Sequence, residues 1–270
     1  MSFRGASAGA YAALRELLDE QLSGDVDAAK RAGDDLFGVS QLLRREASLR
    51  RVATDVSLPA EAKQGLVRQI LDGKIDGAAG SVVDAAVAQR WTRTRDLADA
   101  LESLSEVAVV TSAGSDSGRL ADELFSFAQT VNHAPELRDA LSDPSRSVDD
   151  KVSLLDGLMA DKALPATVTL AKHALAGTYR TVGVALTTYQ HVAAELHGEK
   201  VATVRVAHPL ADGDIQRLTD ALSRQYDREI HLNVVVDPDV IGGIRVEIGD
   251  DVIDGTVVSR LDDARRQLAG

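Results

Sequence analysis

The strongest constraint on the fold of this chain is a change in the spacing of its apolar residues after residue 198. Before this point apolar side chains recur every three or four residues, as Tyr11, Leu14 and Leu18 do, which is the spacing of an amphipathic helix. After it, apolar and polar residues alternate, as they do along residues 201–207, which is typical of a strand. The first part is therefore predicted to be helical and the last part to contain a sheet.

The alternating part predicts a small α/β module with the order β-α-β-β-β-α. Its strands are expected at residues 201–207, 230–236, 244–248 and 252–254, with a helix at 212–226 and a closing helix that includes Leu261 and Leu268. The whole chain is thus predicted to be α+β and predominantly α.

The helical part contains an internal repeat. When the sequence is shifted by 88 residues, Leu36-Phe37 falls on Leu124-Phe125 and Asp55 falls on Asp143. Without any gap, 15 of the 64 pairs from Lys30 to Arg93 are identical, whereas chance in a chain of this composition gives roughly five. The alternative is that two helical stretches coincide by composition, but the matches include turn residues, which favours duplication.

The repeat and a Ser/Gly-rich stretch at residues 112–118 together predict three domains. The first helical bundle is expected at residues 1–112 and the second, an internal duplicate, at 113–198. The α/β module is expected at 199–270.

Charge argues against a nucleic-acid partner. The 270 residues carry a formal net charge of −12, whereas duplex-binding proteins usually present a basic stripe. Local basic islands, such as Arg90, Arg93 and Arg95, are interpreted as solvated helix faces.

Residue types needed for chemistry are missing or badly spaced. The chain has no cysteine, and none of its six histidines forms a metal-binding pair at helical spacing. Gly242-Gly243 leads directly into a predicted strand rather than a helix, so positive φ or a bulge is expected there instead of a phosphate loop. We therefore expect no catalytic site, metal, cofactor or small-molecule ligand.

The N-terminal residues lack the apolar stretch of a signal peptide, and no segment approaches the roughly eighteen apolar residues of a membrane span. Any work at a membrane is expected to depend on a partner.

The C-terminal run from Val235 to Thr256 resembles the signature of the δ subunit of F-type ATP synthases, the family of the oligomycin-sensitivity-conferring protein. The resemblance joins an Asp-Pro turn, an Ile-Gly-Gly sequence, a strand ending in Gly-Asp and an Asp before a small residue. The residues that carry it are Pro209, Asp237, Pro238, Gly242, Gly243, Asp254, Gly255 and Leu261.

The helical part is similar to this family less closely, at Tyr11–Leu14 and at Asp143–Ser145. The usual family pattern has one helical bundle, whereas this chain is expected to carry two, the second without an obvious opening helix of its own. A lengthened form of this kind resembles the δ subunits of actinobacteria.

The resemblance implies a non-catalytic connector at the cytoplasmic face of the cell membrane, held there by the ATP synthase. The helical domain is expected to bind N-terminal helices of the α subunits, and the C-terminal module to bind the C-terminus of the b-type peripheral stalk. The joint is expected to resist rotor torque during proton-driven ATP synthesis.

The candidate α-subunit interface is the stripe of Tyr11, Leu14, Leu17 and Leu18, or a groove beside it. The alternative is that this stripe is wholly internal core. Two rival functions remain at this point: a helical-repeat adaptor of an unrelated cytoplasmic complex, and an enzyme with an unrecognised site.

Overall fold

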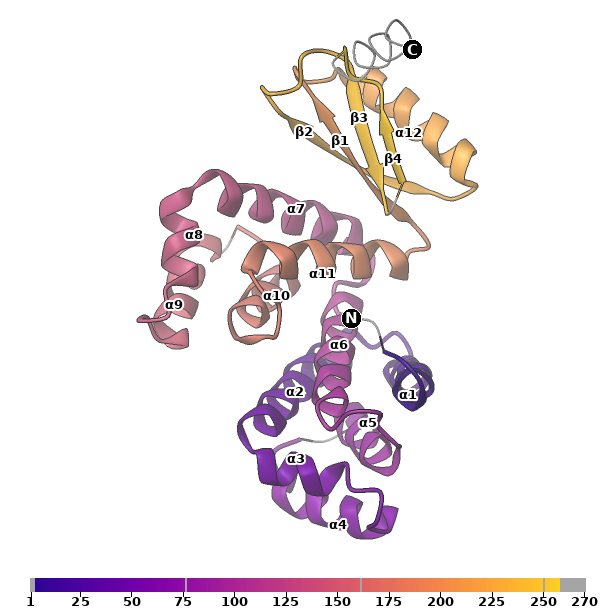
Figure 1. Cartoon of the computed structure of the whole chain (residues 1–270), viewed down its shortest axis with the longest axis vertical. Coiled ribbons are helices and arrows are strands. Elements are labelled where there is room, and N and C mark those ends of the chain that lie inside the picture. Colours follow the sequence, from indigo (N-terminus) through magenta and orange to yellow (C-terminus); the bar gives the residue numbers. More distant parts are fainter. Residues whose placement is uncertain (1–2, 76, 161, 250, 258–270) are drawn as a thin grey trace, which may run out of the picture. The chain divides into compact units, whose positions relative to one another are not determined.

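The computed structural model describes residues 3–75, 77–160, 162–249 and 251–257. The chain forms two compact units, Met1–Ala193 and Ala194–Gly270. The described residues contain twelve α-helices and one four-stranded sheet near the C-terminus (Figure 1). The predicted α+β class, with helix predominating, is confirmed.

The first six helices follow the apolar periodicity closely. They are α1 (Ala6–Leu22), α2 (Val26–Arg45), α3 (Ala47–Ala53), α4 (Ala60–Leu71), α5 (Gly77–Ala88) and α6 (Asp96–Thr111). The separate helix α3 was not predicted from the sequence. The chain leaves the helical conformation at Glu46, and Arg50 donates hydrogen bonds to the carbonyl oxygens of Leu43 (2.7 Å) and Arg44 (3.0 Å). These bonds satisfy carbonyls that the end of α2 leaves without partners.

The next helices are a 3₁₀ turn η1 (Gly114–Asp116), α7 (Ser117–His133), α8 (Pro135–Ser142), α9 (Val148–Met159), α10 (Pro165–Ala176) and α11 (Val182–Leu196). Local chemistry sets several of their starts. Pro135 and Pro165 occupy the first turns of α8 and α10, where proline costs no hydrogen bond. The hydroxyl of Ser147 accepts a hydrogen bond from the Asp150 N–H at 3.1 Å and caps α9.

Helix boundaries in the first compact unit recur at the same 88-residue offset as the sequence matches. Shifted by 88 residues, the bounds of α4 fall on those of α9, and the bounds of α5 fall on those of α10. The turn before each pair also repeats. Asp55 Oδ1 accepts hydrogen bonds from the N–H and hydroxyl of Ser57 at 2.8 and 2.7 Å, and Asp143 Oδ1 accepts the same bonds from Ser145 at the same distances.

Helix α6 occupies two places in this pattern. Shifted by 88 residues, α1 overlaps α6, and α6 in turn overlaps α11. Accordingly α6 packs against α1, α2, α5, α7 and α10, and every residue from Leu97 to Val110 except Asp99 is buried (Figure 1). Where α2 crosses it, a side chain at Gly33 would meet Val109, so glycine permits the close approach.

The second compact unit contains a mixed sheet with the strand order β2-β1-β3-β4. The strands are β1 (Lys200–Val206), β2 (Ile230–Val236), β3 (Ile244–Ile248) and β4 (Asp251–Asp254). β1 and β2 are parallel and are connected through α12 (Asp212–Tyr226), whereas β3 runs antiparallel to both β1 and β4. The predicted bounds of α12, β2 and β3 are confirmed. β1 is shifted by one residue at both ends, and β4 begins one residue earlier than predicted.

The core of this unit lies between the sheet and α12. Ala202, Val204, Val246 and Ile248 contribute from the strands, and Leu222 contributes from α12. The helix predicted to close the module falls on residues 258–270, outside the described residues. The division of the helical region at residue 112 stays a prediction, since both expected bundles lie within one compact unit.

Candidate functional site

The predicted interface stripe on α1 is divided between core and surface. Leu14 and Leu18 are 1% and 0% exposed and belong to the helical core. Tyr11 and Leu17 are half-buried beside that core, and the Tyr11 hydroxyl lies 3.1 Å from the Ser103 hydroxyl of α6. A partner therefore has access to the Tyr11 and Leu17 side of the stripe, but not to the two buried leucines.

The exposed side of α1 carries small residues. Gly9, Ala12 and Ala13 are all exposed, and α1 packs against α5. Small side chains let another helix approach closely, so this face suits a helical partner.

The residues of α6 that lie 88 positions after this face are buried. Shifting Gly9, Ala12 and Ala13 by 88 residues gives Leu97, Ala100 and Leu101 of α6, each of them 0% exposed. The helices that pack on α6 occupy this face within the chain itself. Among the described residues, the α1 positions are thus exposed and the corresponding α6 positions are not.

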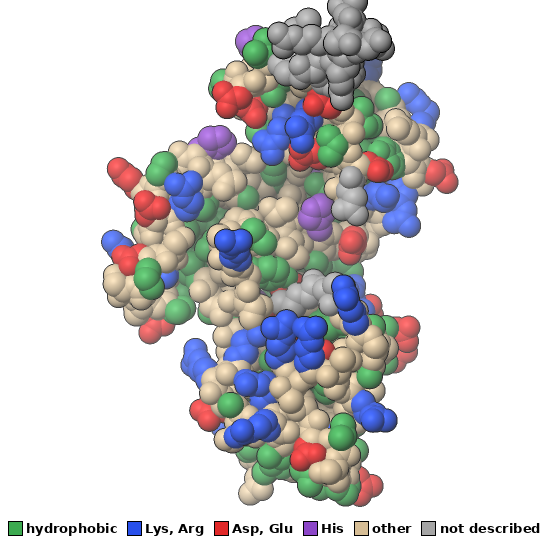
Figure 2. Space-filling model, viewed as in Figure 1, with side chains coloured by type: hydrophobic (Ala, Val, Ile, Leu, Met, Phe, Trp, Pro, Cys, Tyr) green, Lys and Arg blue, Asp and Glu red, His purple; other side chains and the backbone are tan. Residues whose placement is uncertain are grey.

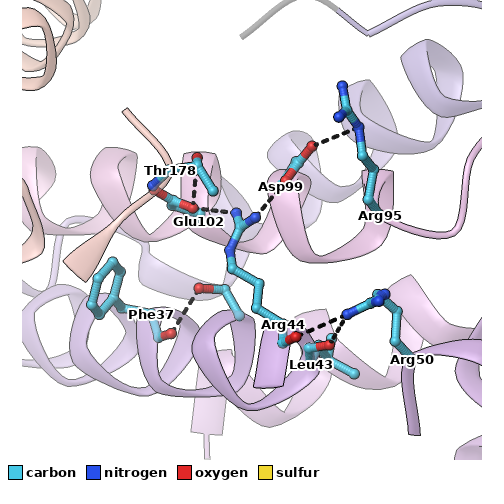
Figure 3. A network of polar contacts seen from close by, with 9 residues as sticks. Phe37, Leu43, Arg44, Arg50, Arg95, Asp99, Glu102 and Thr178 are labelled. Carbon is cyan, nitrogen blue, oxygen red and sulfur yellow. Dashed lines mark hydrogen bonds and ion pairs between the residues drawn. The ribbon is translucent and has the colours of Figure 1, made fainter. Parts of the chain in front are cut away.

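A network of polar contacts connects α6 to α2 and to the loop before α11 (Figure 3). Arg44 of α2 reaches two carboxylates of α6: it binds Asp99 Oδ1 at 2.7 Å and also pairs with Glu102 Oε2. Glu102 is fully buried, yet it also accepts hydrogen bonds from the N–H of Thr178 (2.8 Å) and from its hydroxyl (3.1 Å). A buried carboxylate with this many donors is well satisfied.

The close fit around Glu102 requires a glycine. A Cβ at Gly177 would lie 2.5 Å from Glu102 Oε1, closer than any normal contact. The loop before α11 thus approaches α6 because residue 177 has no side chain.

Glu106 lies one turn further along α6 and is 1% exposed. Burial raises its pKa to about 8, the hydrogen bond from the Tyr179 hydroxyl opposes this rise, and the neighbouring negative charge of Glu102 adds to it. Below pH 8 the group is therefore held mainly as the neutral acid. Burial of their own side chains, and then the negative charge of Glu106, raise the pKa of Tyr179 and of Tyr189 above the ordinary tyrosine value.

A contact between α2 and α10 involves a neutral histidine. The rings of His173 and Phe37 stack at 6° with centroids 3.7 Å apart. Burial lowers the pKa of His173 to about 3, so the imidazole is uncharged at neutral pH. This contact could not be predicted from the sequence, because residues 37 and 173 are brought together only by the fold.

The signature residues of the C-terminal module shape its loops. Gly242 and Gly243 have φ values of 75° and 82°, and a Cβ at Gly243 would lie 2.4 Å from the carbonyl oxygen of Gly255. The Asp254 carboxylate accepts hydrogen bonds from the N–H and the hydroxyl of Thr256 at 3.0 and 2.7 Å. The glycine pair thus adopts the positive φ expected from the sequence and lets two chain segments touch.

The remaining signature residues lie in turns or beyond the described part. Asp237 Oδ1 accepts a hydrogen bond from the Asp239 N–H at 3.0 Å, and Pro238 lies in the same turn after β2. Pro209 lies between β1 and α12. Leu261 lies outside the described residues.

Among the described residues, no helix has both the length and the apolar character required to cross a bilayer. Within the same residues, no three His, Asp or Glu side chains are grouped closely enough to bind a metal ion.

Known proteins match this chain over its whole length. Residues 102–268 match the family described as ATP synthase delta (OSCP) subunit. The chain belongs to this family. An ATP synthase subunit delta of a Nocardioides species is 56% identical and covers 100% of this chain, with 98% of the relative's own length matched.

More distant relatives give the same result. The ATP synthase subunit delta of Kineococcus radiotolerans is 45% identical and that of Streptomyces coelicolor 43%, each over 98% of both chains. The predicted family is therefore confirmed. The family match begins inside α6, while the full-length relatives also include the first five helices of this δ-family chain.

Proposed function

We propose that this δ-family chain is the non-catalytic connector between the catalytic hexamer and the peripheral stalk of an ATP synthase. In this role the helical unit binds N-terminal helices of α subunits, and the C-terminal module binds the C-terminus of a b-type subunit. Membership of the family carries the proposal. The division of the chain into two compact units supports it, because a connector needs two attachment surfaces.

We infer that the α-subunit helix docks on the first bundle rather than the second. The exposed small residues of α1 provide a face for it, and Tyr11 and Leu17 border that face. The equivalent residues of α6 are buried within the chain. A partner helix at the second bundle would have to displace α2 or its neighbours, which costs the burial of a large apolar surface.

The helical unit is best explained as a duplicated bundle with one shared helix. In this proposal α6 closes the first bundle and opens the second, which accounts for the missing opening helix of the second copy. The recurrence of helix bounds and of the Asp55 and Asp143 turns supports the duplication. A shared helix that is buried along most of its length also makes the tandem stiffer than two bundles on a flexible linker.

The mechanical role follows from these attachments. Rotation of the central shaft exerts torque on the hexamer, and a connector fixed to both α and b resists that torque. The complex then holds the chain at the cytoplasmic face of the membrane as a peripheral subunit. A connector of this kind needs binding surfaces and stiffness but no reacting groups.

Binding of an α-subunit peptide tests the proposal. The full chain is titrated with a labelled peptide containing the first residues of the α subunit, and its affinity is compared for Ala12→Glu and Ala62→Glu. Both alanines are exposed on helices, but only Ala12 lies on the proposed face. We expect Ala12→Glu to abolish or strongly weaken binding, because it places a charge in an apolar contact, while Ala62→Glu has no effect. Equal binding by both folded variants contradicts the proposed face.

A further inference from the structure

A cavity of about 750 Å³ in the helical unit gathers basic side chains from several elements. Five arginines line it: Arg4, Arg44, Arg93, Arg95 and Arg180. They come from the segment before α1, from α2, from the turn between α5 and α6, and from the loop before α11. Figure 2 shows Lys and Arg side chains gathered close to the N-terminus in this unit. Such a concentration stands out in a chain whose net charge is −12.

Only part of this positive charge is neutralised within the chain. Arg44 pairs with Asp99 and Glu102, and Arg95 lies 3.8 Å from Asp99. The guanidinium groups of the other three arginines, Arg4, Arg93 and Arg180, form no ion pair or hydrogen bond in the described part of the chain. Asp96 lines the same cavity and accepts hydrogen bonds from the Ser7 hydroxyl and the Arg93 N–H. Three guanidinium groups beside this one carboxylate leave an excess of positive charge, which favours an anion.

On one side of the cavity, hydrogen bonds fix the backbone that carries Arg4 and Arg93. The carbonyl oxygen of Arg4 accepts a hydrogen bond from the Thr92 hydroxyl at 3.0 Å, and the N–H of Arg93 donates to Asp96 at 3.2 Å. Ser7 joins the two segments, since its hydroxyl donates to Asp96 Oδ2 at 2.7 Å and accepts from the Thr92 N–H at 2.8 Å. The side chains of Arg4 and Arg93 are exposed, but a fixed backbone lowers the entropic cost of bringing them together around an anion.

The opposite side is fixed through Glu102. This buried carboxylate holds Thr178 by two hydrogen bonds, and Arg180 follows two residues later. The carboxylates around the cavity are thus occupied with structural partners, and the groups left free are guanidinium groups. Arginine guanidinium groups bind phosphate oxygens in pairs, with charge-assisted hydrogen bonds.

We propose that this arginine cavity binds a compact polyanion that carries several phosphate groups, such as a tripolyphosphate or the triphosphate of a nucleotide. The volume falls within the range of small-ligand sites, and a triphosphate concentrates enough negative charge to meet three separate arginines. An acidic peptide fits less well, because peptide docking relies on an extended apolar groove or a free sheet edge. The ligand contacts both halves of the helical unit, since Arg4 and Arg93 precede α6 and Arg180 follows α10.

Titration calorimetry of the full chain with sodium tripolyphosphate tests the proposal. We expect saturable binding that weakens as salt concentration rises. Arg93→Gln and Arg180→Gln should each lower the affinity about tenfold or more, as expected for a lost charge-assisted hydrogen bond. Arg51→Gln is the matched control: Arg51 is exposed on α3, does not line the cavity and should not change the affinity.

Further titrations with ATP and with a hexaglutamate peptide identify the ligand chemistry. Equal affinity for ATP and tripolyphosphate means that phosphate groups alone are recognised, and tighter binding of ATP means that the nucleoside also contacts the cavity; both support the proposal. Absence of saturable binding of either phosphate compound up to millimolar concentration overturns it. Tighter binding of the glutamate peptide, or equal losses in Arg51→Gln and Arg180→Gln, also overturns it. None of these outcomes depends on which subunits the chain connects.

Discussion

Tyr179 donates a hydrogen bond from its hydroxyl to Glu106 Oε2 at 3.1 Å, and Glu106 itself is only 1% exposed. The residue 88 positions before Glu106 is Leu18, which is fully buried in α1. In the same way Glu102 corresponds to the buried Leu14. Helix α6 thus carries carboxyl groups where α1, at the 88-residue offset, carries leucines. Because buried carboxyl groups need specific partners, these positions join α6 to α2 and to the loop before α11 in one arrangement.

The buried acid makes the stability of the helical unit depend on pH. The pKa of Glu106 is about 8 in the folded chain and near the ordinary value of 4.5 when unfolded, so the unfolded chain releases this proton first as pH rises. The free energy of unfolding should therefore fall between these values, by up to about 1.4 kcal/mol per pH unit. Between pH 7 and 8, urea unfolding followed by fluorescence of the single Trp91 should show this slope. Glu106→Gln should remove it, and an unchanged slope in that variant contradicts the assignment.

His173 gives the opposite dependence in acid. Its pKa is lowered from 6.5 to about 3 by burial, so the unfolded chain binds a proton that the folded chain does not. The stability contribution of the neutral ring is present above pH 6.5 and is lost as pH falls toward 3. His173→Phe keeps a ring against Phe37 but cannot titrate. We expect the variant to lose less stability than the natural chain between pH 6.5 and 5 in the same urea experiment; a parallel loss in both proteins argues against this role.

Core and surface leucines should differ in their effect on stability. Leu14 is 1% exposed in the helical core, whereas Leu66 on α4 is 38% exposed. Leu14→Ala leaves a cavity and should lower the free energy of unfolding by about 2–5 kcal/mol. Leu66→Ala should cost less than about 1.5 kcal/mol, since Leu66 loses less buried surface and solvent can enter the space that it leaves. Similar losses in the two variants would mean that Leu14 is not a core residue in solution.

The glycine pair of the C-terminal module should tolerate no side chain at its second position. Gly243→Ala combines a φ of 82° with a Cβ 2.4 Å from the Gly255 carbonyl oxygen. A residue in this region costs about 1–3 kcal/mol even without a clash. Hydrogen exchange of β1 and β3, followed by mass spectrometry, should become faster in this variant. Gly213→Ala in α12 is the control, because a Cβ there meets nothing within 4 Å, and exchange should stay the same or slow.

Most of the secondary structure was predictable because it depends on local patterns. Alternation fixes the bounds of β2 (Ile230–Val236) and β3 (Ile244–Ile248), and helical spacing fixes α12. The start of α3 was not predictable in the same way. It depends on Arg50 reaching back to the carbonyl groups of Leu43 and Arg44, a contact that leaves the apolar periodicity of residues 26–53 unchanged.

The sites were harder to predict than the elements. Leu14 and Tyr11 share one stripe in the sequence, and only packing separates the buried residue from the accessible one. The burial of α6 was not foreseen either, because it includes charged residues such as Glu102 and Glu106, whose partners are set by the fold. The arginine cavity joins Arg4, Arg93 and Arg180, which are too far apart in the sequence to form a motif.

Cross-linking mass spectrometry of the intact, membrane-extracted ATP synthase tests the connector role most directly. Exposed lysines are available in each part of the chain: Lys30 and Lys74 in the first bundle, Lys162 in the second, and Lys200 in the C-terminal module. We predict cross-links from Lys30 or Lys74 to the N-terminal segment of α, and from Lys200 to the C-terminal end of b. Cross-links to α that come only from Lys162, with none from the first bundle, contradict the proposed docking face. A purified complex in which the chain cross-links to neither α nor b contradicts the connector role itself.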